Sequence, residues 1–209
     1  QNEICYISVG GVKLMAEVIK VIGKNAFVQV FESTRGMRVG DEAEFEGHML
    51  EVTLGPGMLS RNYDGLQNDL DKMEGVFLRR GEYTFPLDND KLWDFKPLAK
   101  VGDKVTAGGW LGEVDENFQP HKIMVPFTFK GEYTVKSLKE AGQYTIGEVI
   151  AVLTDETGKD VEVTMIQRWP VKRAITCYKE KPRPYKLLET GVRTIDTVNP
   201  IVEGGTGFI

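Results

Sequence analysis

The sequence contains few of the residue types that most often build reactive centres. Among its 209 residues there are two cysteines, two histidines and three tryptophans. Cys5 and Cys177 have no metal-binding or redox spacing, which favours a reducing compartment. No apolar run approaches the roughly 20 residues that a membrane-spanning helix needs, and no charged-then-apolar signal peptide is visible. The sequence therefore predicts no membrane insertion.

An excess of positive charge is also missing. The chain has 26 Lys and Arg residues against 31 Asp and Glu residues, which gives a net charge of −5. Composition therefore does not predict that the chain as a whole binds nucleic acid, because such proteins usually carry a basic surface. Hydrophobic residues make up 41% and charged residues 27%, values that are ordinary for a folded domain and exclude a disordered or fibrous chain.

Apolar and polar residues alternate in a way that predicts a mainly β fold. Residues 50–54 and 161–164 each alternate between the two types, as half-buried strands do. Residues 26–31 are rich in β-branched and aromatic side chains, and residues 149–153 form an apolar run expected of a strand buried on both sides. Glycine-containing turn signals separate these segments, which favours sandwiches or barrels.

Two short helices are also predicted. The first covers residues 64–75, with Asp64 as its cap and Gln67 as the capping-box partner. The second follows Thr190 and stops before Pro200. Both are short enough to depend on packing against the rest of the protein.

No catalytic, cofactor-binding or metal-binding residue is predicted. His48 and His121 have no acidic or cysteine partner at ligand spacing and are interpreted as surface or packing residues. Ser60 and Cys177 have no neighbouring base, so nucleophilic catalysis has no support. The glycines of residues 204–207 lack the Gly-Lys-Thr that a phosphate loop needs, and they are interpreted as a plain loop.

The acidic and basic stretches are also interpreted as structural features and not as catalytic or binding sites. Residues 32–35, 88–90 and 115–116 are predicted to be solvated turns. Residues 168–186 are locally basic and carry interleaved aromatic side chains at Trp169, Tyr178 and Tyr185. A protein contact or a packed surface strap is the favoured interpretation, and stacking on nucleic acid is the alternative.

Residues 101–114 follow the pattern V-G-D-x-V-x-x-G-x-x-L-G-x-V. This pattern resembles one half of the barrel-sandwich fold of lipoyl and biotinyl carrier domains, and residues 123–126 and 147–153 resemble the other half. A carrier presents a lysine at an exposed hairpin tip, whereas the matching residues 114–118 contain none. The fold is therefore expected, and the carrier function is only an alternative.

Taken together, the motifs resemble the N-terminal part of the catalytic A subunits of A-type/V-type ATP synthases. Clear matches are L-G-P-G-M-L at 54–59, H-K-I-M-V-P at 121–126 and Q-R-W-P-V at 167–171. Further matches, in the family's order, lie at residues 16–19, 26–36, 64–67, 77–81, 183–185, 189–197 and 204–206. Residues 198–203 depart from the family's pattern.

This resemblance implies an incomplete N-terminal β-barrel, an inserted barrel-sandwich domain called the bulge, short helices and the start of a nucleotide-binding domain. The expected divisions are a barrel portion at 1–56, a helix and connection at 57–91, the bulge at 92–155, and a return strand with the lead-in to the nucleotide-binding domain at 156–209.

The resemblance also implies a function. The parent protein would couple ATP hydrolysis or synthesis, with Mg-ATP, to proton or sodium movement in a rotary complex. Its phosphate loop is expected just after Ile209, so these 209 residues are expected to be non-catalytic and to hold no cofactor or metal. The expected partners are B subunits and further A subunits in a hexameric ring, and peripheral and central stalk subunits, without nucleic acid. The expected location is the cytoplasm, peripheral to the membrane. The alternatives are a carrier-like domain and an oligonucleotide-binding β-barrel.

Overall fold

A computed structural model describes residues 1–75, 77–178, 180 and 183–207. The chain forms two compact units, Gln1–Ile175 and Thr176–Ile209. Lys179 and residues 181–182 of the predicted basic stretch lie outside the described residues, as do Phe208 and Ile209. Most of the regular structure is β-strand, so the predicted mainly β fold is confirmed.

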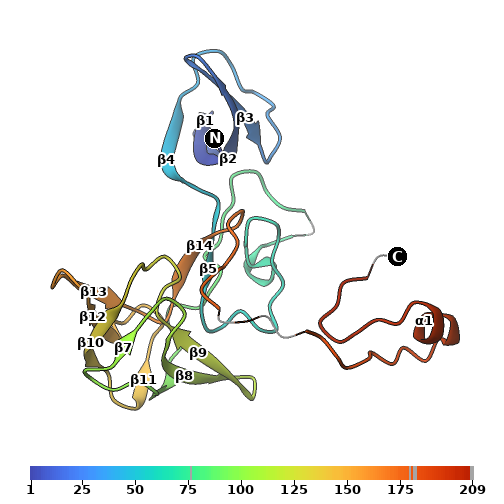
Figure 1. Cartoon of the computed structure of the whole chain (residues 1–209). Helices are drawn as coiled ribbons and strands as arrows, with labels where there is room; N and C mark the ends of the chain where they lie inside the picture. Colours follow the sequence, from blue (N-terminus) through green and yellow to red (C-terminus); the bar gives the residue numbers. More distant parts are fainter. Residues whose placement is uncertain (76, 179, 181–182, 208–209) are drawn as a thin grey trace. The chain divides into compact units, whose positions relative to one another are not determined.

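The first unit begins with a four-stranded antiparallel sheet, the N-terminal sheet (Figure 1). Its spatial order is β3-β2-β1-β4, formed by β1 (Glu3–Val9), β2 (Val12–Ile22), β3 (Asn25–Val30) and β4 (Ala43–Met49). The strand predicted at residues 26–31 is confirmed as β3. The core of this sheet is a small cluster of buried side chains, namely Cys5, Ile7, Val9, Leu14 and Ala16.

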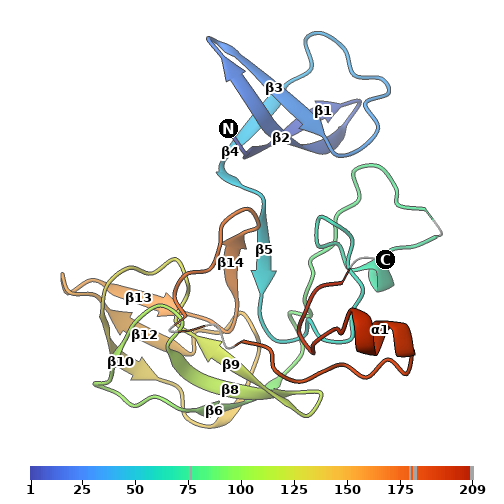
Figure 2. The same cartoon turned by 45° about the vertical axis from the view of Figure 1, so that its right-hand side comes forward.

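After β4 the chain leaves this sheet and forms strand β5 (Glu51–Leu54). This strand pairs antiparallel with β14 (Gln167–Pro170), as Figure 2 shows. The half-buried strand predicted at residues 50–54 is thus confirmed, since Leu50, Val52 and Leu54 are all half-buried. Thr53 is the buried residue of β5, and the side-chain amide of Gln67 bonds its backbone twice. The Gln67 Oε1 accepts the Thr53 N–H and its Nε2 donates to the Thr53 carbonyl, each at 2.7 Å.

The remainder of the first unit contains two further four-stranded sheets. One has the order β11-β6-β8-β9 and the other β13-β12-β10-β7. Their bounds are β6 (Trp93–Pro97), β7 (Lys104–Val105), β8 (Trp110–Glu116), β9 (Gln119–Met124), β10 (Tyr133–Leu138), β11 (Gly142–Tyr144), β12 (Ala151–Thr154) and β13 (Asp160–Val163). The strand predicted at residues 149–153 is confirmed over 151–153 as β12, and the one predicted at 161–164 is confirmed over 161–163 as β13.

Two buried clusters fill these sheets. The first contains Leu87, Trp93, Phe95, Val114, Ile123, Ile146, Ile150 and Met165. The second contains Leu111, Val125, Val135, Ala151, Leu153 and Val163. Gly112, from the V-G-D-x-V pattern, lies against the first cluster. A Cβ at this position would lie 2.2 Å from Phe95 Cε2, so only glycine lets β8 approach the ring this closely.

The helix predicted over residues 64–75 is wrong. The structure has only a 3-10 turn, η1 (Leu70–Lys72), in this stretch. Asp64 does bind backbone N–H groups, those of Leu66 at 2.9 Å and Asn68 at 2.8 Å, but it does so in a loop. Gln67 takes a positive φ of 64°, which ends any right-handed helix at this point. Its side chain is instead bound to Thr53 in β5.

The second unit contains one helix among its described residues, α1 (Arg193–Val198), which confirms the helix predicted between Thr190 and Pro200. Asp196 accepts hydrogen bonds from the Thr190 hydroxyl at 2.6 Å and from the Gly191 N–H at 3.0 Å. These bonds, led by that of the hydroxyl, lower the pKa of the Asp196 carboxyl. Within the described residues, no helix has the length and apolar character needed to cross a membrane.

Candidate functional site

The sheets β11-β6-β8-β9 and β13-β12-β10-β7, both inside the first compact unit, are together called the two-sheet unit. Residues 57–91 connect the N-terminal sheet to it and, where described, contain no strand longer than an isolated bridge. Three carboxylates in the described part of the chain are buried, Glu17, Asp69 and Glu116. Asp69 lies on this connection, Glu116 accepts hydrogen bonds from it, and Glu17 in β2 pairs with Lys172. A buried carboxylate must be hydrogen-bonded or paired with a cation, so its partners reveal its role.

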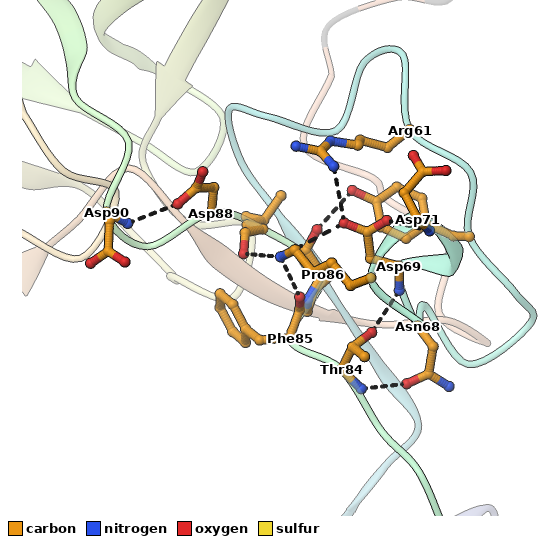
Figure 3. Close-up of polar contacts among 12 residues, drawn as sticks. Arg61, Asn68, Asp69, Asp71, Thr84, Phe85, Pro86, Asp88 and Asp90 are labelled. Carbon is orange, nitrogen blue, oxygen red and sulfur yellow. Dashed lines mark hydrogen bonds and ion pairs between the residues drawn. The ribbon is translucent and has the colours of Figure 1, made fainter. Parts of the chain in front are cut away.

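Asp69 is the first of these carboxylates and is 1% exposed (Figure 3). Its N–H donates to the Thr84 hydroxyl at 2.8 Å, and the Thr84 N–H donates to the side-chain oxygen of Asn68 at 2.9 Å. The Asp69 carboxylate faces Arg61 at 3.4 Å and Lys72 at 3.7 Å. Residues 68 and 69 therefore bond Thr84, and the carboxylate of Asp69 is paired with two basic side chains.

Lys72 extends this network to the backbone before β6. Its Nζ donates to the carbonyls of Phe85 at 3.2 Å and Leu87 at 3.1 Å. The Tyr63 hydroxyl donates to the neighbouring carbonyl of Pro86 at 2.9 Å. These side chains satisfy carbonyl groups that no strand partner reaches, and so they replace regular secondary structure in fixing the connection.

Glu116, at the end of β8, is 3% exposed. Its Oε1 accepts the N–H groups of Gly57 at 2.7 Å and Leu59 at 2.9 Å, and its Oε2 lies 2.7 Å from His121 Nδ1. We call this arrangement the Glu116 clamp. The prediction of a solvated turn is wrong for Glu116, although Asp115 is exposed. His121 has an acidic partner that linear spacing did not reveal, because the pairing of Val114 with His121 places residues 116 and 121 diagonally across the β8–β9 hairpin.

Glu32 is likewise not a solvated turn residue, which corrects a second prediction. It is half-buried, and its two oxygens accept the Tyr83 hydroxyl at 2.5 Å and the Gly81 N–H at 2.6 Å. The Tyr83 oxygen in turn accepts the Met15 N–H in β2 at 2.9 Å. Burial, and then the hydrogen bond to Glu32, raise the pKa of the Tyr83 hydroxyl well above its usual range. A cavity of about 600 Å³ adjoins this pair and is also lined by Glu17 and Arg80.

The other residues weighed from sequence lie apart from one another. His48 is exposed, and Asp88 lies in an exposed turn where it accepts the Asp90 N–H at 3.0 Å. The Ser60 hydroxyl accepts a hydrogen bond from the Asn117 amide at 3.0 Å. Cys177 is half-buried. In the described part of the chain, no group of three or more His, Cys, Asp or Glu side chains is arranged to hold a metal ion.

The basic stretch is divided between the two units. The Trp169 ring is buried, packs edge-on against Phe127, and donates from Nε1 to the Arg173 carbonyl at 2.7 Å, so its faces are not free for stacking. Lys172 pairs with the buried Glu17 of β2 at 2.5 Å. Tyr185 is exposed. The part of the stretch in the first unit is therefore a packed strap that returns to the N-terminal sheet.

Chemically, this site joins parts of the chain. Glu17 and Glu116 bond groups that lie 57 to 155 residues away, which the linear sequence does not place beside them. Asp69 also has local partners. The motif L-G-P-G-M-L is the part of the sequence that could have indicated close contacts here, because glycines allow another segment to approach. Gly57 has a φ of +104°, and a Cβ on Gly55 would lie 2.6 Å from Ile166.

Two family models match the chain. The ATP synthase alpha/beta family beta-barrel domain matches residues 1–47, and the ATP synthase alpha/beta subunit barrel-sandwich domain matches residues 84–172. The first match covers most of the N-terminal sheet. The second covers the two-sheet unit together with β14.

Relatives match almost the whole chain. It is 47% identical to the V-type ATP synthase alpha chain of Treponema denticola over 98% of its own length. It is 46% identical to that of Borrelia garinii subsp. bavariensis over 98%, and 43% identical to that of Protochlamydia amoebophila over 99%. The chain spans only about a third of the length of these relatives, 35% or 36% of each.

Proposed function

Because this chain belongs to the ATP synthase alpha/beta family, we propose that it serves as a non-catalytic N-terminal part of the subunit that hydrolyses or synthesises ATP in a rotary ATP synthase. The parent protein binds Mg-ATP and couples its turnover to proton or sodium movement. The observation that carries this proposal is the 47% identity to a V-type alpha chain over nearly the whole sequence. The bonding of the buried carboxylates to backbone and basic groups supports an architectural role.

The proposed division of labour follows the two matched domains. The barrel portion, residues 1–56, holds a hexameric ring of A and B subunits together. The bulge, residues 92–155, contacts the peripheral stalk, and residues 57–91 fix the bulge relative to the barrel. Residues 156–209 return to the barrel and lead into the nucleotide-binding domain, whose surroundings include the central stalk. The complex lies on the cytoplasmic side of a membrane, and this part of it stays outside the lipid.

Assembly with the partner subunits is the direct test. The tagged chain is co-expressed with the other V-type subunits encoded in the same genome, and captured proteins are identified by mass spectrometry. We expect capture of B and peripheral-stalk subunits. Hydrogen exchange on the purified assembly should then show protection of residues 1–47 by B subunits and of residues 92–155 by stalk subunits. Failure to capture either class would contradict the proposal.

Three further measurements separate the alternatives. The chain alone is expected to release phosphate from ATP no faster than buffer, and turnover above that level would overturn the non-catalytic assignment. An intact mass equal to the sequence mass is expected, whereas a lipoyl-sized or biotinyl-sized increment would favour a carrier. Tight, steeply salt-dependent binding to oligonucleotides would favour the nucleic-acid alternative.

A further inference from the structure

The cavity of about 600 Å³ lies where the N-terminal sheet meets the connection. Residues 31–33 line it from the end of β3, and residues 64–66 and 78–83 line it from the connection. Its wall is largely apolar and includes Phe31, Leu50, Leu66, Met73 and Leu78. A concave, mostly apolar space of this size with a few polar groups has the usual form of a small-molecule site.

Arg80 lines this cavity and has a guanidinium group that is only partly paired. Its Nη1 donates a hydrogen bond to the Arg35 carbonyl at 2.8 Å. Its Nε and Nη2 are buried, and neither has a hydrogen-bond acceptor among the residues that the structure describes. Burying a cation without a partner costs free energy, so these two nitrogens favour any state in which they gain an acceptor.

The two unpaired nitrogens of Arg80 form one edge of the guanidinium plane. Their N–H groups point in the same direction, and this fork matches the two oxygens of a carboxylate. The described chain itself already covers both nitrogens, so further protein packed on the outside would not reach them. An acceptor for this fork therefore has to enter through the cavity.

The lining also contains four acidic side chains, Glu17, Glu32, Asp64 and Glu82. The first three have partners of their own. Glu17 pairs with Lys172, and Glu32 accepts the Tyr83 hydroxyl. Asp64 accepts three N–H groups of the loop that follows it, at 2.8–2.9 Å. The negative charge of these groups repels a multiply charged anion such as phosphate more strongly than a singly charged one.

We propose that this cavity binds a small monocarboxylate with an apolar body. The Arg80 fork holds the carboxylate through two parallel N–H···O bonds, and the apolar wall buries the hydrocarbon part. Because the fork is covered, lining side chains have to move slightly. Leu78 is 58% exposed and the Arg79 side chain 66% exposed, so these two can move with little loss of packing. The inference is independent of the proposed function, which requires no such ligand.

Three probes test the proposal on the wild-type chain: octanoate below its micelle-forming concentration, octanamide and inorganic phosphate. Octanoate should bind once per chain in titration calorimetry and raise the melting temperature, because it binds the folded state. Octanamide has the same apolar body without the charge, and phosphate has charge without the apolar body. Each of these two should bind roughly tenfold more weakly or worse.

Variants of Arg80 test the role of its fork. Arg80→Lys keeps the positive charge but loses the planar fork, and it should bind octanoate roughly tenfold more weakly or worse. Arg80→Met removes the charge and should abolish the preference for octanoate over octanamide. The matched control is Arg38→Met, which makes the same change in net charge at an exposed residue outside the cavity lining. It should bind octanoate like the wild type.

Several results would overturn the proposal: no binding of octanoate to the wild type, equal binding of octanoate and octanamide, or undiminished binding by Arg80→Lys. Circular dichroism checks that the variants are folded. If an Arg80 variant is not, nitrogen-15 NMR of the wild type decides, since octanoate should shift the Arg80 Nε–H resonance and an unshifted resonance refutes the site. None of these failures would affect the capture of B and stalk subunits, which tests the proposed function separately.

Discussion

The N-terminal sheet and the two-sheet unit are both built from short antiparallel strands, yet they bury their side chains very differently. The two-sheet unit encloses two clusters, and Phe95, Leu111 and Leu153 are almost completely buried in them. The N-terminal sheet covers only one small cluster and leaves Phe27 and Phe45 about half exposed. The two-sheet unit therefore closes its cores around large side chains, whereas the N-terminal sheet closes a core of small and medium-sized side chains and leaves Phe27 and Phe45 at its margins.

The largest expected effect comes from removing one phenylalanine on each side of this comparison. Phe95→Ala should lower the free energy of unfolding by about 3–5 kcal/mol, because it leaves a cavity in a closed core. Phe45→Ala, the matched variant, should change it by less than about 0.5 kcal/mol in the isolated chain. Urea denaturation followed by fluorescence measures both, and similar losses would mean that Phe45 packs as tightly as Phe95.

A smaller effect is expected from the Glu116 clamp, which joins the two-sheet unit to the connection. Glu116→Ala leaves the N–H groups of Gly57 and Leu59 without their acceptor, and should cost roughly 1–3 kcal/mol of unfolding free energy. Limited proteolysis should cut residues 57–62 faster than in the wild type.

The control is Glu116→Gln, which keeps one acceptor oxygen and should restore most of the stability and protease resistance. If the alanine and glutamine variants behave alike, the hydrogen bonds to the loop do not hold the two parts together.

The smallest effect concerns the N-terminal sheet and depends on pH. Tyr83 has a raised pKa when folded, owing first to burial and then to Glu32. An unfolded tyrosine ionises near pH 10, at about its ordinary pKa. Above that pH the unfolded chain binds fewer protons than the folded one, so the stabilisation present below pH 10 is lost as pH rises.

Tyr83→Phe should therefore cost about 1 kcal/mol at neutral pH and make stability fall less steeply above about pH 10. Thermal unfolding of both proteins across this range measures the difference. Tyr6 and Cys5 also have pKa values raised chiefly by burial, so some slope should remain. An unchanged slope would mean that Tyr83 ionises as readily in the folded chain as in the unfolded one.

Strand positions were predictable from sequence because alternation is a local property. The segments 26–31, 149–153 and 161–164 contain enough β-branched residues to be identified without knowledge of their neighbours. The face that each strand buries was harder to predict. Thr53 is the most buried residue of β5, although its neighbours Val52 and Leu54 are the apolar ones, and Gln67 bonds its backbone from another segment.

The failed helix and the missed carboxylates have the same cause. Asp64 and Gln67 fit a capping box, but the same polar groups satisfy loop and strand backbone when the chain folds back on β5. In the sequence Glu116 resembles an exposed turn residue. In the structure the β8–β9 hairpin places His121 beside it, and the N–H groups of Gly57 and Leu59 bond it. Those partners depend on tertiary register, which a single sequence does not encode locally. The proposed four-segment division of the chain remains a prediction.

The two cysteines differ in burial, so their rates of reaction with a thiol reagent report on different parts of the chain. The Cys5 sulfur is inaccessible within β1, and desolvation disfavours the reactive thiolate by raising its pKa. Cys177 belongs to the second unit and is only half-buried. A thiol reagent should therefore modify Cys177 first, and later modification of Cys5 would time the opening of the N-terminal sheet. If Cys5 is labelled more slowly inside an assembly than in the free chain, neighbouring subunits reduce the opening of the N-terminal sheet. The ratio of the two labelling rates measures that stabilisation without an engineered cysteine.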